Sequence, residues 1–448
     1  MNFHLSALTL MLSLSCLSQA GYADGKYLQI EYPPSTAAGE LQIGVTYRLW
    51  LPNGVTRFRC LIVHQHGAGR TAAEKGATAA YDLHWQALAK KWDCTLLGPS
   101  YDVLTDATDA SPGGSELWFD PRRGSDKSFF KALDEFSAQT HHPELAIVPW
   151  ALWGHSGGAI WADMMTVMYP TRVAAAWLRS GSFLNRAGYE QVVTPAAAYA
   201  VPVMGNAGVK EKERGSWINT LARMREYRGK GGPAGFAADP RTGHETGDSR
   251  YLAIPFLDTV LAMRLPARGG SSQRLKPVDM SEAWLARFNE QSAVPAASYQ
   301  GEARDALWLP DERVARIWME YVTNGTVADV TPPPAPFNVQ VTSIGNGGNE
   351  ITWEAEADFD SGIGGFFVMR NGQALARLPT MLPLGVYGRP LFQGLSYHDT
   401  PEGPPASAPM RYLDASARPG EQHTYNVLAV NSAGVTSEAS ADVVIPSP

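Results

Sequence analysis

The sequence predicts an α/β fold with a doubly wound, mainly parallel sheet, followed by a smaller all-β domain. Between residues 25 and 330, short apolar runs alternate with helix-like stretches, as they do in successive βαβ units. Near residue 327 the stretch VADVTPPPAPFNVQV is rich in proline, which is typical of a linker. Beyond this stretch the helix-like patterns disappear, and apolar and polar residues alternate. We therefore expect one domain over residues 25–330 and a second over residues 331–448.

Strands of the first domain are expected where apolar residues run together, and helices where apolar residues recur every three to four positions. The expected strands are 45–52, 58–66, 94–100, 149–155, 174–181, 200–208 and 234–240. The expected helices are 78–92, 128–140, 216–229 and 251–266. Two later stretches, MSEAWLARFNE (280–290) and DERVARIWMEYV (311–322), are also expected to be helices that pack on this domain.

Composition and the N-terminal stretch limit where the protein acts. A net charge of −7 over 448 residues argues against nucleic acid or an anionic membrane as the main partner. Residues 4–20 are apolar and end in small residues, which predicts a signal peptide at residues 1–20 and a secreted or periplasmic protein; the alternative is a buried N-terminal helix. No other segment reaches the ~20 apolar residues that a membrane span requires.

Two cysteines, Cys60 and Cys94, remain after the predicted signal peptide. Both lie near the start of predicted strands, and neither has a neighbouring histidine motif that would indicate a nucleophile. A single disulfide and two inert buried thiols are both compatible with the sequence.

The stretch ALWGHSGGAIWADMM (151–165) places Ser156 between a strand and a helix, with Gly154 and Gly158 two residues away on either side. A serine on such a sharp turn has a strained backbone, and glycines are needed where larger side chains would clash with the adjacent strand and helix. This Gly-x-Ser-x-Gly motif resembles the nucleophile elbow of the α/β hydrolases. The resemblance covers residues 40–266 and implies an α/β-hydrolase fold with Ser156 as the nucleophile.

A serine nucleophile needs a base and an acid, which follow it in the order Ser, acid, His in this family. His244 lies on the loop after the last predicted strand, where the resemblance places the catalytic histidine. For the acid, the stretch VPVMGNAGVKE aligns Glu211 with the family's usual aspartate. Glu213 and Asp239 remain alternatives, because the role requires only a carboxylate that accepts from the histidine.

The segment LIVHQHGAGR resembles the His-Gly oxyanion motif of lipases and esterases. This resemblance implies that the backbone N–H groups of Gly157 and Ala68 bind the oxyanion, with Gly69 as an alternative to Ala68. His64 and His66 could instead form a metal-binding H-x-H pair, but hydrolytic zinc sites add further ligands close by, and here Gly-Ala-Gly follows. No metal or cofactor is therefore expected.

The C-terminal domain resembles a fibronectin type III sandwich. Asn371-Gly372 between two alternating runs predicts a β-hairpin. Trp353 corresponds to the core tryptophan of an early strand, and Tyr425 to the tyrosine corner. The acidic residues Glu354, Glu356, Asp358 and Asp360 are compatible with a Ca²⁺ site, but the favoured interpretation is a solvated acidic loop.

Together these resemblances imply a secreted serine hydrolase that cleaves carboxylic esters through an acyl-enzyme. The short interval between Ser156 and Glu211 leaves no room for a large lid, which favours polymeric or carbohydrate-linked esters as substrates. A serine peptidase of the prolyl-oligopeptidase type would use the same triad, but such enzymes usually carry an N-terminal propeller that has no room here. A non-catalytic hydrolase-fold binding protein would be expected to lack the serine or the histidine, and both are present.

Overall fold

The computed structural model describes residues 25–69, 76–102, 118–269, 274–344, 348–378, 410–418 and 421–446. The predicted signal peptide lies outside these residues. Within the described part of the chain, no helix has the length and apolar character needed to span a bilayer.

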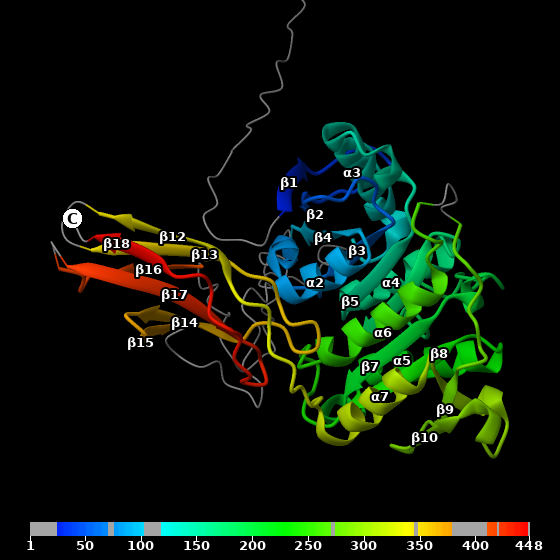
Figure 1. Cartoon of the computed structure of the whole chain (residues 1–448). Coiled ribbons are helices and arrows are strands. Elements are labelled where there is room, and N and C mark those ends of the chain that lie inside the picture. The colour runs from blue at the N-terminus through cyan, green and yellow to red at the C-terminus, as the bar shows by residue number, and fades with distance from the viewer. Residues whose placement is uncertain are drawn as a thin grey trace, which may run out of the picture.

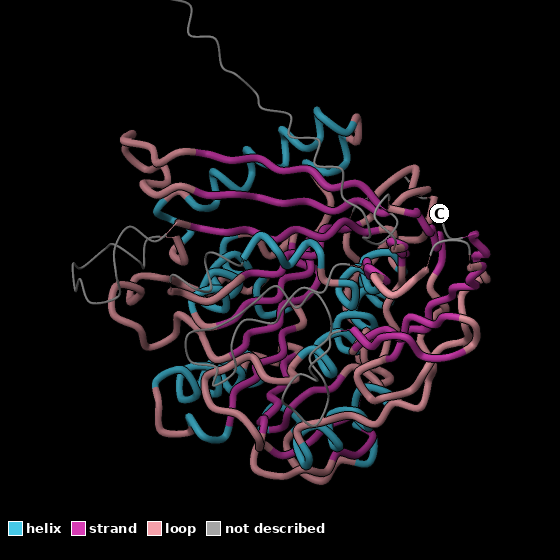
Figure 2. The backbone as a smooth tube through the Cα atoms, turned by 90° about the vertical axis from the view of Figure 1, so that its left-hand side faces the viewer, coloured by secondary structure: helices cyan, strands magenta, loops and turns pink. Residues whose placement is uncertain are grey.

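An eight-stranded sheet forms the centre of the first part of the chain, in the order β1-β2-β4-β3-β5-β6-β7-β8 (Figure 1, Figure 2). The strands are β1 (Gly25–Tyr32), β2 (Val45–Pro52), β3 (Cys60–Gln65), β4 (Cys94–Tyr101), β5 (Trp150–His155), β6 (Val173–Arg179), β7 (Val203–Gly208) and β8 (Ala234–Asp239). Strand β2 pairs antiparallel with β1 and β4, and the strands from β4 to β8 are parallel. This mainly parallel sheet fits the α/β-hydrolase fold.

Helices cover both faces of this sheet (Figure 1). They are α2 (Leu83–Lys91), α3 (Ser125–Thr140), α4 (Gly157–Met168), α5 (Gly215–Gly229), α6 (Arg250–Arg264) and α7 (Glu312–Asn324). Helix α6 contacts both α2 and α7, whereas α4 packs on β5 and β6, and α5 packs on β7 and β8. Strands β5, β6 and β7 are buried along their whole length, as expected for a parallel sheet that is covered on both faces.

Two local differences from the sequence prediction have a tertiary cause. Strand β1 is not predicted, because this half-exposed edge strand, interrupted by Lys26, Gln29 and Glu31, lacks the continuous apolar run of the central strands. The prediction of a helix at 280–290 is wrong: Trp284–Arg287 forms β9, which pairs with β10 (Ala293–Pro295) and β11 (Ala306–Leu309). Pairing with the fully buried β11 outweighs the local helix-like pattern.

The helix predicted at 311–322 is α7, which Asp311 caps by accepting from Val314 N at 2.8 Å.

In the described residues of the C-terminal part, from 331 to 446 with gaps, the regular elements are all strands. One sheet has the order β12 (Phe337–Ser343), β13 (Asn349–Glu354), β16 (Arg411–Asp414), and the other has the order β15 (Gln373–Leu378), β14 (Gly365–Arg370), β17 (Gln422–Val430), β18 (Val443–Pro446). Trp353 and Tyr425 are both buried in the core between these sheets, and the Tyr425 hydroxyl donates to Asp414 Oδ2 at 2.7 Å. Asn371 and Gly372, with φ of 53° and 77°, form the tight turn between β14 and β15. These all-β sheets fit a sandwich.

The sandwich packs beside α2 (Figure 1). Leu83 at the start of α2 belongs to the apolar cluster that forms the sandwich core. His84 Nε2 hydrogen-bonds Phe359 O at 2.7 Å, and Lys90 forms an ion pair with Glu356. The two parts of the chain are therefore joined by side-chain packing as well as by the linker.

Cys60 and Cys94 are joined by a disulfide, with 4.6 Å between their Cα atoms. The two residues are register partners at the first positions of the parallel strands β3 and β4. The bridge is fully buried and lies at the amino-terminal edge of the sheet.

Candidate active site

Ser156 occupies a strained turn between β5 and α4. Its φ of 51° and ψ of −115° lie in a region that side-chain-bearing residues rarely adopt. A Cβ atom on Gly154 would lie 2.1 Å from Gly158 O, and one on Gly158 would lie 2.4 Å from His66 O. Only glycine fits at these two positions, and with glycine there the tight turn holds the partly exposed serine at the carboxyl end of β5.

Three side chains from distant loops form a continuous hydrogen-bonded chain. Ser156 Oγ lies 2.9 Å from His244 Nε2, and His244 Nδ1 lies 2.7 Å from Glu211 Oε2. His244 is on the loop between β8 and α6, and Glu211 is on the 3-10 turn directly after β7. Because parallel strands end at the same edge of the sheet, these loops meet above Ser156. The arrangement has the geometry of a nucleophile, a base and an orienting acid.

Glu211 is buried, and its carboxylate is fully engaged. Ser180 Oγ donates to Oε1, while Ser216 Oγ donates to Oε2 at 2.5 Å. Burial alone would raise the pKa of Glu211, but the hydrogen bonds from His244, Ser180 and Ser216 outweigh that effect, and the pKa is lowered from its ordinary value. The carboxylate thus stays ionised beside the His244 ring.

The other two candidate acids lie elsewhere. Asp239 is buried, accepts from the Tyr321 hydroxyl at 3.1 Å and from Arg241 N at 3.0 Å, and thereby ties β8 to α7. Glu213 is exposed. Among the described residues, Glu211 is the carboxylate that hydrogen-bonds His244 Nδ1.

Gly157 and Ala68, the two residues predicted to form the oxyanion hole, lie next to each other in space. Gly157 is the first residue of α4, and a Cβ atom on it would lie 3.2 Å from Ala68 N. Within the described residues, neither the Gly157 N–H nor the Ala68 N–H has a hydrogen-bond acceptor. The positive end of the α4 dipole adds to the attraction for a negatively charged oxygen there.

His66 supports the loop that carries Ala68. Its Nδ1–H donates to Gly67 O at 2.6 Å, and its Nε2 accepts from Tyr101 N at 3.1 Å. Burial lowers the pKa of His66 to about 4, and it lowers the pKa of His64 well below its ordinary value. The His64 ring stacks on Trp153 at a centroid distance of 4.0 Å. The two histidines are thus neutral residues packed against aromatic rings, His64 against Trp153 and His66 against Trp118.

Two residues that the sequence analysis does not single out hold the His244 loop. Arg179, fully buried at the end of β6, donates from Nη2 to Thr242 Oγ1 at 2.8 Å and from Nε to Glu245 O at 3.0 Å. His155 Nε2 donates to His244 O at 2.5 Å. A signal for Arg179 was present in the sequence, since it is a lone cation at the end of an otherwise apolar strand.

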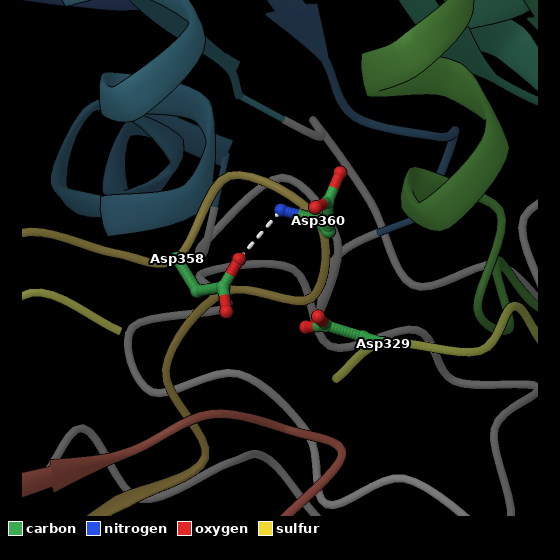
Figure 3. A group of neighbouring side chains, drawn as sticks. All are labelled: Asp329, Asp358 and Asp360. Carbon is green, nitrogen blue, oxygen red and sulfur yellow. Dashed lines mark hydrogen bonds between the residues drawn. The ribbon is translucent and has the colours of Figure 1, made fainter. Parts of the chain in front are cut away.

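The structure brings Asp329 together with two residues of the acidic loop, Asp358 and Asp360, whose oxygens lie within 4.8 Å of one another (Figure 3). Asp358 accepts from Asp360 N at 2.7 Å, and Asn431 Nδ2 bridges Asp358 and Asp329 at 2.9 Å each. These contacts connect the linker to the sandwich. Glu356 points elsewhere, toward Lys90.

Neither a protein-family model nor a curated protein matches this sequence. Among solved structures, the chain is similar to a thermostable esterase (15% identity, TM-score 0.35, 50% of this chain and 56% of that one). It is also similar to a ferulic acid esterase (13% identity, TM-score 0.38, 53% of this chain and 98% of that one). A Fn3-like protein from Clostridium thermocellum matches 26% of this chain and 96% of its own length, with 19% identity and a TM-score of 0.16. The chain thus spans little more than half of the thermostable esterase.

Proposed function

We propose that this protein is a serine hydrolase that cleaves carboxylic esters through an acyl-enzyme. The observation that carries the proposal is the unbroken chain from Ser156 Oγ through the His244 ring to the Glu211 carboxylate, with links of 2.9 and 2.7 Å. A serine hydroxyl is a weak nucleophile until a base within hydrogen-bond reach removes its proton.

In the first half of the reaction, His244 Nε2 takes the Ser156 proton while Oγ attacks the ester carbonyl. The negative charge that develops on the carbonyl oxygen is bound by the N–H groups of Gly157 and Ala68. His244 then gives the proton to the departing alkoxide, and the C–O bond of the ester breaks. Glu211 keeps the ring in the tautomer with hydrogen on Nδ1 and stabilises the imidazolium.

In the second half, water replaces the alcohol. His244 takes a proton from the water, the hydroxide attacks the acyl carbon, and the Ser156–acyl bond breaks. The proton returns to Oγ, and the carboxylic acid leaves. No metal or cofactor is required for these steps.

We further propose polymeric or carbohydrate-linked esters as substrates. Residues 180–202, between β6 and β7, contain a loop and the 3-10 turn η4 (Ala198–Ala200) but no α-helix that could serve as a lid there. Ser156 and His244 are both partly exposed. A serine that the described residues leave partly exposed favours bulky substrates over a buried lipid tail.

Export and a fibronectin type III-like role for the sandwich complete the proposal. The disulfide between Cys60 and Cys94 supports export, because such bonds persist in oxidising compartments. The buried Trp353 and Tyr425 and the order of the strands support the type III resemblance.

The test is the release of p-nitrophenol from p-nitrophenyl acetate and butyrate by purified residues 24–448. We expect turnover by the wild type, its loss in Ser156→Ala, and its retention in Ser298→Ala, which changes an exposed serine. Undiminished activity of Ser156→Ala would overturn the assignment. Hydrolysis of a p-nitroanilide at a comparable rate would favour a peptidase. A panel of acetylated sugars, feruloyl esters and aliphatic polyesters then identifies the acyl and alcohol groups.

A further inference from the structure

A cavity of about 550 Å³ lies at the edge of the sheet opposite Ser156. Its walls include the segments that precede β6, β7 and β8, and the chain that follows α6. Since these segments enter the amino ends of parallel strands, whereas Ser156, Glu211 and His244 follow carboxyl ends, the cavity is separate from the candidate active site. Its volume lies in the range of small-molecule sites.

The charged side chains that line this cavity are all cationic. They are Lys230, Arg264, Arg274 and Lys276, and none of the described lining residues is an aspartate or a glutamate. This concentration of positive charge contrasts with a chain whose net charge is −7. Asp279, which neighbours this wall, instead accepts from Ser281 N at 2.9 Å.

Arg264, the last residue of α6, is 7% exposed, and within the described residues its guanidinium has no carboxylate partner. Its Nε and Nη1 are buried and find no hydrogen-bond acceptor. Burial, which no acidic neighbour opposes, lowers the pKa of Arg264 to about 10, so it remains charged at neutral pH.

Other buried arginines of this chain do have acceptors. Arg223 pairs with Asp163 at 3.0 Å, and Arg250 pairs with Asp82 at 2.8 Å. Arg228, whose pKa is likewise lowered by burial, donates to the carbonyls of Ala306 and Gly232. Burying a cation without a partner is costly in free energy. The other buried arginines avoid this cost through their acceptors, so the unpaired Arg264 calls for a separate explanation.

We propose that this cavity binds a small organic anion, whose phosphate, sulfate or carboxylate oxygens accept hydrogen bonds from Arg264. A guanidinium presents paired N–H donors that match such groups. Lys230 and Lys276 are exposed and add attraction at the rim. Lys276 N also donates to Arg264 O at 2.8 Å, which attaches the rim to the end of α6.

The rest of the lining indicates that the ligand has an organic body. Tyr199, Leu275, Val278 and Met280 supply apolar surface. The volume exceeds what a bare inorganic anion would fill. We therefore expect a molecule of about the size of a phosphorylated or acidic sugar. The proposal does not depend on the proposed esterase activity.

Isothermal titration and thermal melting of residues 24–448 test this site. The probes are glucose 6-phosphate, glucuronate, inorganic phosphate and inorganic sulfate, with glucose and sodium chloride of equal ionic strength as blanks. We expect at least one of the two sugar anions to bind at least fivefold more tightly than the inorganic ions, with glucose showing no binding. The ratio of the two sugar anions distinguishes a phosphate site from a carboxylate site. No binding by either sugar anion, or a melting shift equal to that of chloride, would overturn the proposal.

Arg264→Met is the decisive variant, because it keeps an unbranched apolar side chain and removes the guanidinium with its charge. We expect at least tenfold weaker binding, together with a melting temperature without ligand that equals or exceeds that of the wild type, since an unpaired buried charge is removed. Lys276→Ala should weaken binding severalfold, and Arg316→Met, on the exposed face of α7, should not change it. Unchanged binding in Arg264→Met, or a lower melting temperature with unaltered affinity, would assign Arg264 a structural role and refute the site.

Discussion

The guanidinium of Arg179 holds the backbone on both sides of His244. Nη2 donates to Gly243 O at 3.1 Å, and Nε donates to Glu245 O at 3.0 Å. A further bond from Nη1 to Asn206 Oδ1 at 2.9 Å anchors the same group to β7. None of these guanidinium bonds reaches the side chain of Ser156 or Glu211, and the Arg179 backbone carbonyl accepts from Ser156 N at 2.8 Å. Arg179 is thus a positioning residue that fixes where the imidazole stands relative to the serine.

Replacing Arg179 with methionine should impair turnover more than substrate binding. The variant leaves the Gly243 and Glu245 carbonyls without their donor, so the His244 ring loses its fixed position. We expect kcat to fall by roughly 10- to 100-fold, with KM nearly unchanged, because misplacement of about 1 Å costs on that order. Steady-state kinetics on p-nitrophenyl butyrate measure this split. An equal loss in stability with intact kcat would mean that Arg179 serves only the fold.

The identity of the acid can be tested with a matched pair of amides. Glu211→Gln keeps the shape of the side chain but offers an amide to His244 Nδ1, and we expect kcat to fall by about 10²- to 10⁴-fold. Asp239→Asn, which changes a carboxylate bound to Tyr321, should keep activity within a few-fold while lowering the melting temperature. Loss of activity in Asp239→Asn with full activity in Glu211→Gln would reverse the assignment.

The disulfide should stabilise the fold without affecting catalysis. Cys60 and Cys94 are 34 residues apart in sequence, and cross-linking a loop of this size reduces the entropy of the unfolded chain. We expect the double variant Cys60→Ala/Cys94→Ala to lose about 3–4 kcal/mol of unfolding free energy in urea titrations. Its kcat should match that of the wild type at 25 °C, because the bridge lies at the edge of the sheet opposite Ser156. A dithiothreitol-treated wild type provides the control.

The aspartate cluster at the linker should make stability depend on pH. Burial and the facing negative charge of Asp329 raise the pKa of Asp358 to about 6, against about 3.9 in an unfolded chain. The folded state therefore binds the extra proton between about pH 4 and about pH 6, and the contribution of Asp358 to stability declines as the pH rises through this interval.

Asp358→Asn cannot ionise and should lose this pH dependence, while its amide oxygen can still accept from Asp360 N. We expect the melting temperature of the variant, relative to the wild type, to be higher at pH 7 than at pH 4. Scanning calorimetry at pH 4, 5, 6 and 7 measures the difference, with Glu438→Gln, an exposed position, as the reference. A difference that stays constant with pH would contradict the expected protonation.

Local features of the site could be predicted from the sequence because their causes are local. Gly154 is required by a contact within the turn itself, with Gly158 O, and the same turn imposes the strained φ on Ser156, whereas Gly158 is required by the close approach of His66 O after β3. The strands that end at these loops are continuous apolar runs, which a buried parallel sheet demands. The half-exposed β1 and the short β9 lack such runs, so only their pairing with neighbouring strands makes them extended.

Contacts between residues far apart in the sequence were decided by the tertiary structure. From the sequence, Glu211, Glu213 and Asp239 are all candidates for the acid that hydrogen-bonds His244. Which carboxylate does so depends on how the loop after β7 packs beside Ser180 and Ser216. The sequence equally permits free thiols or a bridge at Cys60 and Cys94, and the pairing of β3 with β4 makes them neighbours. Patterns of apolar residues specify which segments are buried, but contacts between segments far apart in the chain arise only when the whole sheet has assembled.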